Sequence, residues 1–206
     1  ESFNDPGIKM TEKNISIHGI ANEMVSGKSI DWIRVEEIFE SSDIIVAHNA
    51  RFDRSFMDKY FPQSQDKVWA CSVNDIDWSK LGFNSRSQEL LCIWHGFYYE
   101  SHRAMSDVDA LIYLVTHDSY VDEKPIKILI ETAYELRYKI IALNSSIQYK
   151  DILRTNGYFW NASEKYWWKS ISEDELEDEK SWMEKYIYGG PFLGQVELIT
   201  PADRYK

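Results

Sequence analysis

The chain has few cysteines and no long apolar run. Its 206 residues include two cysteines, Cys71 and Cys92, which are too few for a disulfide framework and suit a reducing compartment. No stretch approaches the roughly 18 apolar residues that a membrane span needs, and the N-terminus lacks the charged and then apolar layout of a signal peptide. We therefore expect a cytoplasmic protein with no membrane partner.

Basic side chains are also scarce. Lys and Arg number 23 against 34 Asp and Glu, a net charge of −11. Such a surface repels phosphates, which argues against tight non-specific binding of nucleic acid over the whole molecule. A local basic patch, or a carboxylate site that works through bound cations, stays open. Charge is unevenly spread, because residues 137–170 hold six basic and two acidic side chains, whereas residues 173–179 hold six acids in seven positions.

The rest of the composition is typical of a packed soluble protein. Hydrophobic residues make up 44% and charged residues 28%, and the aromatic share of 15% includes eight tryptophans. The length suits one medium domain, or one domain with a small appendage. Because the chain changes character in the polar stretch near residue 120, we expect two domains, residues 1–125 and 126–206.

The pattern of apolar residues predicts an α/β protein. In the first domain, short apolar runs typical of buried strands alternate with helical periodicity, whereas residues 1–17 resemble loop. The expected strands are 43–47 and 68–71, and the expected helices are 31–40, 51–61, 72–81, 86–95 and 104–117. The second domain is predicted to be a small α+β unit with a helix at 145–156, an aromatic hairpin at 158–168, a helix that begins with the acidic run and a strand at 196–199.

Three clusters contain residues that could perform chemistry. They are Val46–Asp53, where a strand runs into a helix, His102–Asp107 at the start of a helix, and the short segment Ile17–Ile20. Each residue taken singly has a simpler interpretation. Asp53 could cap its helix, His102 could be a surface loop residue, Asp107 could pair with Arg103, and His18 could sit in a turn.

Taken in order, the clusters resemble the DEDDh (DnaQ-like) class of 3′→5′ exonucleases. IHGIANEMVSGK (17–28) is similar to the segment of that class containing His-Gly-Ile, VAHNARFDRSFM (46–57) to its second motif and HRAMSDVDALIYLV (102–115) to its third. VWACSVNDIDW (68–78) and HGFYYESHRA (95–104) resemble a bacterial DNA polymerase III epsilon-like subgroup, which carries a C-terminal extension like residues 150–171.

The resemblance implies a ribonuclease H-like fold and a metal-dependent nuclease that releases 5′-monophosphates from a 3′ end. Asp53 and Asp107 would bind metal, and His102 would be the general base. Residues His18, Gly19 and Ile20 would line the pocket for the terminal nucleotide, supported by Asn49 and Phe52. The implied cofactors are two Mg²⁺ or Mn²⁺ ions. The implied partners are nucleic acid with a free 3′ end, most simply single-stranded DNA, and a DNA polymerase or other replication protein.

Physical chemistry is compatible with these roles. Two cations about 3.5–4 Å apart can activate water and stabilise an alkoxide leaving group, and carboxylates are the hard ligands that Mg²⁺ prefers. A histidine with a pKa of about 6.5 can accept a proton from water at neutral pH. Bound cations also reverse the local charge, so an acidic protein can hold a phosphate there.

One motif of the class is missing. Its first motif, Asp-x-Glu on the first strand of the sheet, supplies two of the four metal carboxylates, and residues 1–17 offer only Glu1, Asp5 and Glu12 outside any strand-like run. The sequence begins at Glu1 rather than at methionine, so we expect N-terminal strands outside the given sequence. As given, the chain should bind metal weakly and cleave slowly or not at all.

Two rival functions remain open. The chain could be a catalytically impaired remnant that binds nucleic acid or a replication partner, or a phosphoesterase that uses His and Asp on one metal. The C-terminal aromatics could form a mini-core, or some rings could stack on unpaired bases beside the basic residues Lys150, Arg154, Lys165 and Lys169.

Overall fold

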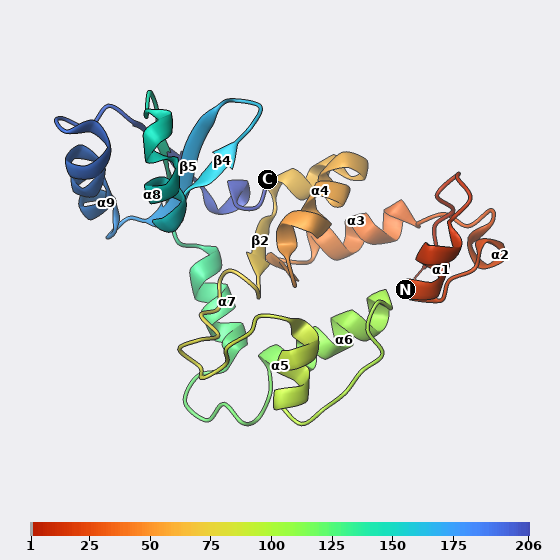
Figure 1. Ribbon diagram of the computed structural model, residues 1–206. Coiled ribbons are helices and arrows are strands. Elements are labelled where there is room, and N and C mark those ends of the chain that lie inside the picture. The colour runs from red at the N-terminus through yellow and green to blue at the C-terminus, as the bar shows by residue number, and fades with distance from the viewer. Residues whose placement is uncertain (1) are drawn as a thin grey trace. The chain divides into compact units, whose positions relative to one another are not determined.

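The structure is a computed structural model that describes residues 2–206 as two compact units (Figure 1). The first unit holds the chain up to Ala133 together with Tyr205–Lys206, and the second is Tyr134–Arg204. Helix α7 (Pro125–Ala133) belongs to the first unit. The division therefore follows this helix, whereas the boundary expected from the sequence lies at its start.

Two parallel strands form the sheet of the first unit. Strand β1 (Ile44–Ala47) pairs with β2 (Val68–Cys71), and Ile44 lies opposite Val68. The crossover that parallel strands require runs through α4 (Ala50–Tyr60) and a 3₁₀ helix, Pro62–Asp66. Within residues 2–206, β1 pairs with β2 alone, so its other edge carries no ladder hydrogen bonds from the described chain.

The two faces of this sheet pack into two separate cores. Trp69 and Cys71 belong to a cluster with Phe39 and Phe61, whereas Ala70 belongs to a cluster built from α5, α6 and α7. This division follows from the alternation of side chains along β2. Because both faces are covered, the mixed α/β class expected from the sequence is confirmed.

Three further helices of the first unit confirm expected ones, namely α3 (Trp32–Glu40), α5 (Gln88–Trp94) and α6 (Ala104–Val115). Two others, α1 (Glu12–His18) and α2 (Asn22–Val25), were not expected. Helix α1 replaces part of the loop expected at 1–17, and the side chain of Thr11 caps it by accepting from the backbone N–H of Asn14.

The helix expected at 72–81 is wrong, since this stretch forms turns. Two aspartates explain the difference. Asp75 Oδ2 accepts from the backbone N–H of Cys71 at 2.7 Å, and Asp77 Oδ1 accepts from those of Ser79 and Lys80. Such local bonds compete with the helical hydrogen bonds of the backbone.

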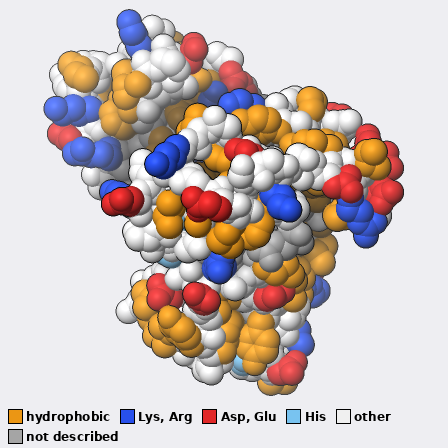
Figure 2. All heavy atoms as spheres, turned by 90° about the vertical axis from the view of Figure 1, so that its right-hand side faces the viewer, with side chains coloured by type: hydrophobic (Ala, Val, Ile, Leu, Met, Phe, Trp, Pro, Cys, Tyr) orange, Lys and Arg blue, Asp and Glu red, His pale blue; other side chains and the backbone are white. Residues whose placement is uncertain are grey.

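Apolar side chains at helical spacing in α4 and α6 are exposed. In α4 the rings of Phe52, Phe56 and Tyr60 face solvent, and in α6 the same holds for Val108 and Ile112. Figure 2 shows hydrophobic side chains gathered on the surface of the part of this unit that holds α5 and α6. Each helix is amphipathic, but the described residues cover only part of its apolar surface.

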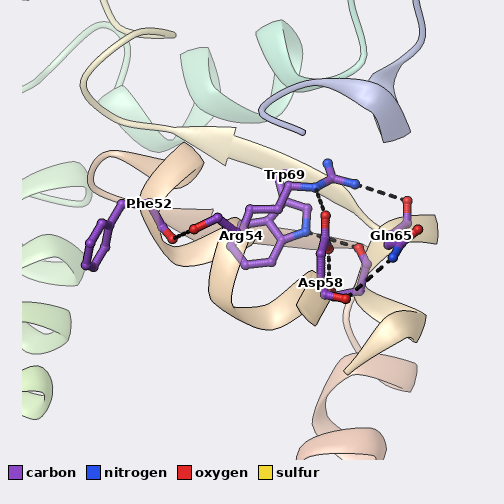
Figure 3. A network of polar contacts seen from close by, with 7 residues as sticks. Phe52, Arg54, Asp58, Gln65 and Trp69 are labelled. Atoms are coloured by element: carbon purple, nitrogen blue, oxygen red, sulfur yellow. Dashed lines mark hydrogen bonds and ion pairs between the residues drawn. The ribbon is translucent and has the colours of Figure 1, made fainter. Parts of the chain in front are cut away.

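A buried arginine fixes α4 to the segment that follows it (Figure 3). The side chain of Arg54 is fully buried; its Nε lies 3.1 Å from Asp58 Oδ2, and its Nη2 donates to the carbonyl of Gln65 at 3.0 Å. Its guanidinium also lies 5.9 Å from the ring centroid of Trp69. Asp58 accepts a further hydrogen bond from the hydroxyl of Ser64. This network sets the orientation of the helix that carries Asp53.

The second unit is a four-stranded antiparallel sheet with helices packed on it. The strand order is β4–β5–β3–β6, with β3 Arg137–Ala142, β4 Phe159–Asn161, β5 Tyr166–Ser172 and β6 Gln195–Ile199. The aromatic hairpin and the last strand were expected. No element was assigned to residues 137–142, although β3 lies in the middle of the sheet.

The core of the second unit lies on one face of that sheet. Ile140 and Ile171 pack there with Leu153 of α8 (Lys150–Thr155) and Met183 of α9 (Leu176–Met183). A π-helical turn, Glu184–Tyr188, continues α9. Within residues 2–206, no helix has the length and apolar character needed to cross a bilayer.

Candidate active site

Polar side chains meet where β1 and β2 end. His48 follows β1 and Ser72 follows β2, and because parallel strands end at the same edge of a sheet, the two residues become neighbours. His48 Nδ1 lies 2.8 Å from Ser72 Oγ. Ser72 is fully buried; its backbone N–H donates to Ala47 and its carbonyl accepts from Trp78 Nε1 at 2.6 Å.

His48 also connects this edge to the start of α6. Burial lowers the pKa of the His48 imidazole, while a hydrogen bond to the backbone of Arg86 and the charge of Asp107 oppose the shift. Burial therefore favours the neutral form of the imidazole, and the ring is close enough to Asp107 to sense its charge. Two of the sequence clusters thus come together in space.

The structure holds Asp107 through several contacts. Its Oδ1 accepts from the backbone N–H of His102 at 3.3 Å. Its carbonyl accepts from Nε2 of Gln88, a largely buried residue at the start of α5, at 2.6 Å. Burial and then the neighbouring charge of Asp107 raise the pKa of Tyr99, whose hydroxyl also hydrogen bonds to Asp107. The Asp107 carboxylate is accordingly constrained before any ligand binds.

His102 stands just outside α6 in an unusual backbone conformation. Its φ of 68° is left-handed, and its side chain is exposed. A non-glycine residue with such a φ is worth attention, because it carries a modest energetic cost that tertiary structure must offset. Here it lets the His102 N–H point at Asp107 while the imidazole remains open to water.

The other helix start carries Asn49, Phe52 and Asp53. Asn49 has a left-handed φ of 72° and precedes α4, and the ring of Phe52 is exposed and lies 5.2 Å from that of Phe56. Asp53 lies in the first turn of α4. Burial raises the pKa of its carboxyl, although the side chain keeps a solvent-exposed face.

His18, Gly19 and Ile20 form the turn that ends α1. Gly19 has a φ of 67°, the left-handed conformation typical of a helix C-cap. The backbone N–H of Ile20 donates to His18 Nδ1 at 3.0 Å. The local contacts match the turn with a satisfied ring nitrogen that was weighed for His18 alone.

The residues present do not complete a metal site. The resemblance described above implies divalent metals, but residues 2–206 contain no group of three or more His, Cys, Asp or Glu side chains that could hold an ion. Within the same described range, no hydrogen bond, ion pair or electrostatic effect joins Asp53 to Asp107. The structure thus groups Asp107 with His102, while the places of Asp53 and His18 in the site stay predictions.

Sequence reasoning left four residues out of the proposed site, namely His48, Ser72, Gln88 and Tyr99. Ser72 could have been found, because it follows the second expected strand just as His48 follows the first. Gln88 and Tyr99 carry no such signal, since only tertiary packing brings them to Asp107.

Comparisons with known proteins identify the family of the chain. The profile of the RNase T family, described as exonuclease, matches residues 2–115. Two similar relatives are proteins named DNA polymerase III PolC-type. The one from Listeria monocytogenes is 30% identical over 122 residues, which cover 55% of this chain and 8% of the relative. The one from Listeria innocua is 29% identical over 121 residues, with the same shares.

The chain therefore spans only a small part of the length of these relatives. No solved structure matches it. Because the family profile covers more than half of the chain and includes all three sequence clusters, the protein belongs to the RNase T exonuclease family.

Proposed function

We propose that the protein is a metal-dependent 3′→5′ exonuclease that removes nucleoside 5′-monophosphates from the 3′ end of nucleic acid, with DNA favoured over RNA. Family membership supports exonuclease chemistry. The similarity to PolC-type DNA polymerase III supports a replication setting, an epsilon-like role and a replication partner. A cytoplasmic location is part of the same proposal.

The observation that carries the proposal is the pairing of His102 with Asp107. The backbone of His102 holds the carboxylate while its imidazole faces solvent. A general base must reach water and must keep its position relative to the substrate site. A helix surface residue with no catalytic role would not need a strained backbone or three separate donors.

The roles follow from these positions. His102 accepts the proton of the attacking water, and Asp107 and Asp53 are the carboxylates that would face bound Mg²⁺ or Mn²⁺. Divalent cations supply charge neutralisation at the phosphate. Two carboxylates do not suffice for two ions, so full activity requires further carboxylates at the site. His18, Gly19, Ile20, Asn49 and Phe52 remain the proposed pocket for the terminal nucleotide.

A second function is favoured by the unpaired edge of β1 and by the incomplete metal site. On this alternative the chain binds nucleic acid or a replication partner without cutting. The two functions differ in one measurable respect, which is the shortening of a labelled strand.

The test is a nuclease assay on a single strand labelled at its 5′ end, with Mg²⁺ or Mn²⁺. It uses this chain beside a version that begins upstream with an Asp-x-Glu strand. We expect the longer protein to shorten the strand stepwise and Asp107→Ala to abolish this. The exonuclease proposal fails if the longer protein leaves the strand intact, or if its Asp107→Ala variant digests at the parental rate.

A further inference from the structure

The hairpin of β4 and β5 exposes aromatic rings on its outer strand. Phe159 is 64% exposed and Trp160 is 48% exposed. As neighbours in a strand, they point to opposite faces of the sheet. Each leans on a ring of β5 directly across the ladder, Phe159 on Trp168 at 5.8 Å between ring centroids and Trp160 on Trp167 at 5.5 Å. These pairs hold the exposed rings in place, so a flat ligand that stacks on them costs little side-chain entropy.

The second unit has two exposed lysines that can contact an anion. Lys165 ends the hairpin loop, with an exposed side chain and a backbone N–H that donates to Asn161 at 2.8 Å. Lys150 is exposed at the start of α8. Neither lysine forms a salt bridge with any residue from 2 to 206. Both are therefore available to an anion.

The other two basic residues that the sequence offers are engaged. Lys169 Nζ lies 2.6 Å from Glu179 Oε2 in a largely enclosed pair, which corrects its expected role as a phosphate contact. Arg154 pairs with Asp151 at 2.9 Å on the surface of α8. Of the four basic side chains considered as phosphate contacts, Lys165 and Lys150 remain without a salt bridge among the described residues.

Charge in the second unit is divided between two parts of its sequence. Residues 137–170, which include the hairpin up to Ser170, carry six basic and two acidic side chains, whereas the rest of the unit carries three basic and ten acidic. Two of the six basic side chains pair with acids of the other part, Lys139 with Glu197 and Lys169 with Glu179. Only part of the net charge of +4 on residues 137–170 is therefore left to attract a polyanion.

From these observations we propose that the β4–β5 hairpin binds single-stranded nucleic acid that passes around the edge strand β4, with one unpaired base on Phe159 at one face, another on Trp160 at the other face, and phosphates beside Lys165. Every base offers a flat face, so such stacking tolerates any sequence, while cations follow the backbone. A duplex keeps its bases stacked on each other and should bind less well. The inference rests on the proposed function, because the strand held here is the one that the active site would shorten.

The experiment measures binding without cleavage. The full chain is titrated into a fluorescently labelled oligothymidine strand at low salt in the presence of a chelator of divalent cations, and anisotropy reports binding. We expect Phe159→Ala and Trp160→Ala each to weaken binding about tenfold, and Phe159→Trp to retain it. Lys165→Glu should weaken binding and reduce its dependence on salt.

Matched variants on α9 and its continuation serve as controls. Lys185→Glu makes the same charge change and Tyr186→Ala removes an exposed ring, both far along the chain from the hairpin; we expect parental affinity. The inference is overturned if the parent does not bind the strand, if the hairpin variants bind like the parent, or if the controls lose as much. A protein whose hairpin variants lose binding, but which cuts no strand in the nuclease assay, would retain this inference and lose the proposed function.

Discussion

The hydroxyl of Tyr205 donates a hydrogen bond to the carboxylate of Asp75, which lies 130 residues earlier in the chain. Asp75 is largely buried, and its other oxygen accepts from the backbone N–H of Cys71 at the end of β2. The ring of Tyr205 packs beside the cluster of Phe39, Phe61 and Trp69. Residue 205 is therefore part of the first unit, even though the second unit intervenes in the sequence.

Removing this hydroxyl should destabilise the first unit. Tyr205→Phe keeps the packing of the ring but leaves a buried carboxylate oxygen without one donor, which costs about 1–3 kcal/mol of the free energy of unfolding. Urea unfolding followed by tryptophan fluorescence measures the change. Tyr98→Phe alters a tyrosine that is 78% exposed and should leave the midpoint unchanged. Equal midpoints for Tyr205→Phe and the parent would show that the hydrogen bond contributes nothing.

Truncating the buried arginine of α4 should have a larger effect. Arg54→Met keeps much of the volume but leaves Asp58 with only the hydroxyl of Ser64 and leaves the carbonyl of Gln65 without this donor. Breaking a buried pair from one side costs about 3–5 kcal/mol. Thermal melting of the variant beside the parent gives the measurement.

The matched control is Arg34→Met, because Arg34 and Glu37 form an exposed pair on α3. Exposed pairs contribute at most about 1 kcal/mol. If both arginine variants melt together, burial of Arg54 does not matter and the network in Figure 3 does not anchor the helix.

Local patterns in the sequence predicted the elements of the first unit but not their exposure. The apolar runs at β1 and β2 and the caps and periodicity of α3, α4 and α6 act over a few residues, so they can be recognised directly. Whether Phe52 or Ile112 is covered depends on segments elsewhere, and their exposure could not be deduced from the helix itself. Strand β3 was missed although Arg137 and Lys139 alternate with apolar residues, a pattern typical of a half-buried strand.

In the candidate site, too, the sequence predicts local relationships but not those that depend on tertiary packing. The five-residue spacing of His102 and Asp107 is local, and it does place the backbone of one against the carboxylate of the other. His48, Gln88 and Tyr99 reach Asp107 from different elements, so no spacing in the sequence announces them. The role of Asp53 stays a prediction.

Acid should destabilise the first unit through His95. Its Nδ1 lies 2.6 Å from the carbonyl of Leu91 and its Nε2 lies 2.6 Å from the hydroxyl of Tyr120. Burial and then the nearby charge of His117 lower the pKa of His95, against the hydrogen bond to Leu91. A lowered pKa means that the unfolded state binds the proton first, so this stability is complete above the unfolded pKa of about 6.5 and is lost as pH falls below it.

The midpoint of thermal unfolding, measured from pH 8 down to about pH 5, tests this sign. His95→Gln should melt lower than the parent at pH 8 and should show a smaller drop on acidification. His117 and Tyr120 are the titratable groups that face the ring of His95. His117→Gln is therefore the control for the contribution of His117 to the pH dependence of the midpoint. A variant that loses stability with acid as steeply as the parent would assign the effect to another group.

Loss of the His102 imidazole should slow the reaction without weakening the fold. The side chain is exposed and the contact to Asp107 comes from the backbone, so His102→Gln keeps that hydrogen bond while removing the base. General-base catalysis contributes about 10²–10⁴-fold, and kcat should fall by that amount in the upstream-extended protein with Mn²⁺. Strand affinity measured with a chelator present should not change, because the hairpin proposed for binding is untouched. His117→Gln removes another histidine of the same unit and should keep parental kcat. A parental rate in His102→Gln would remove the general base from the proposed mechanism, whereas a loss shared by both variants would point to damage of the unit rather than to catalysis.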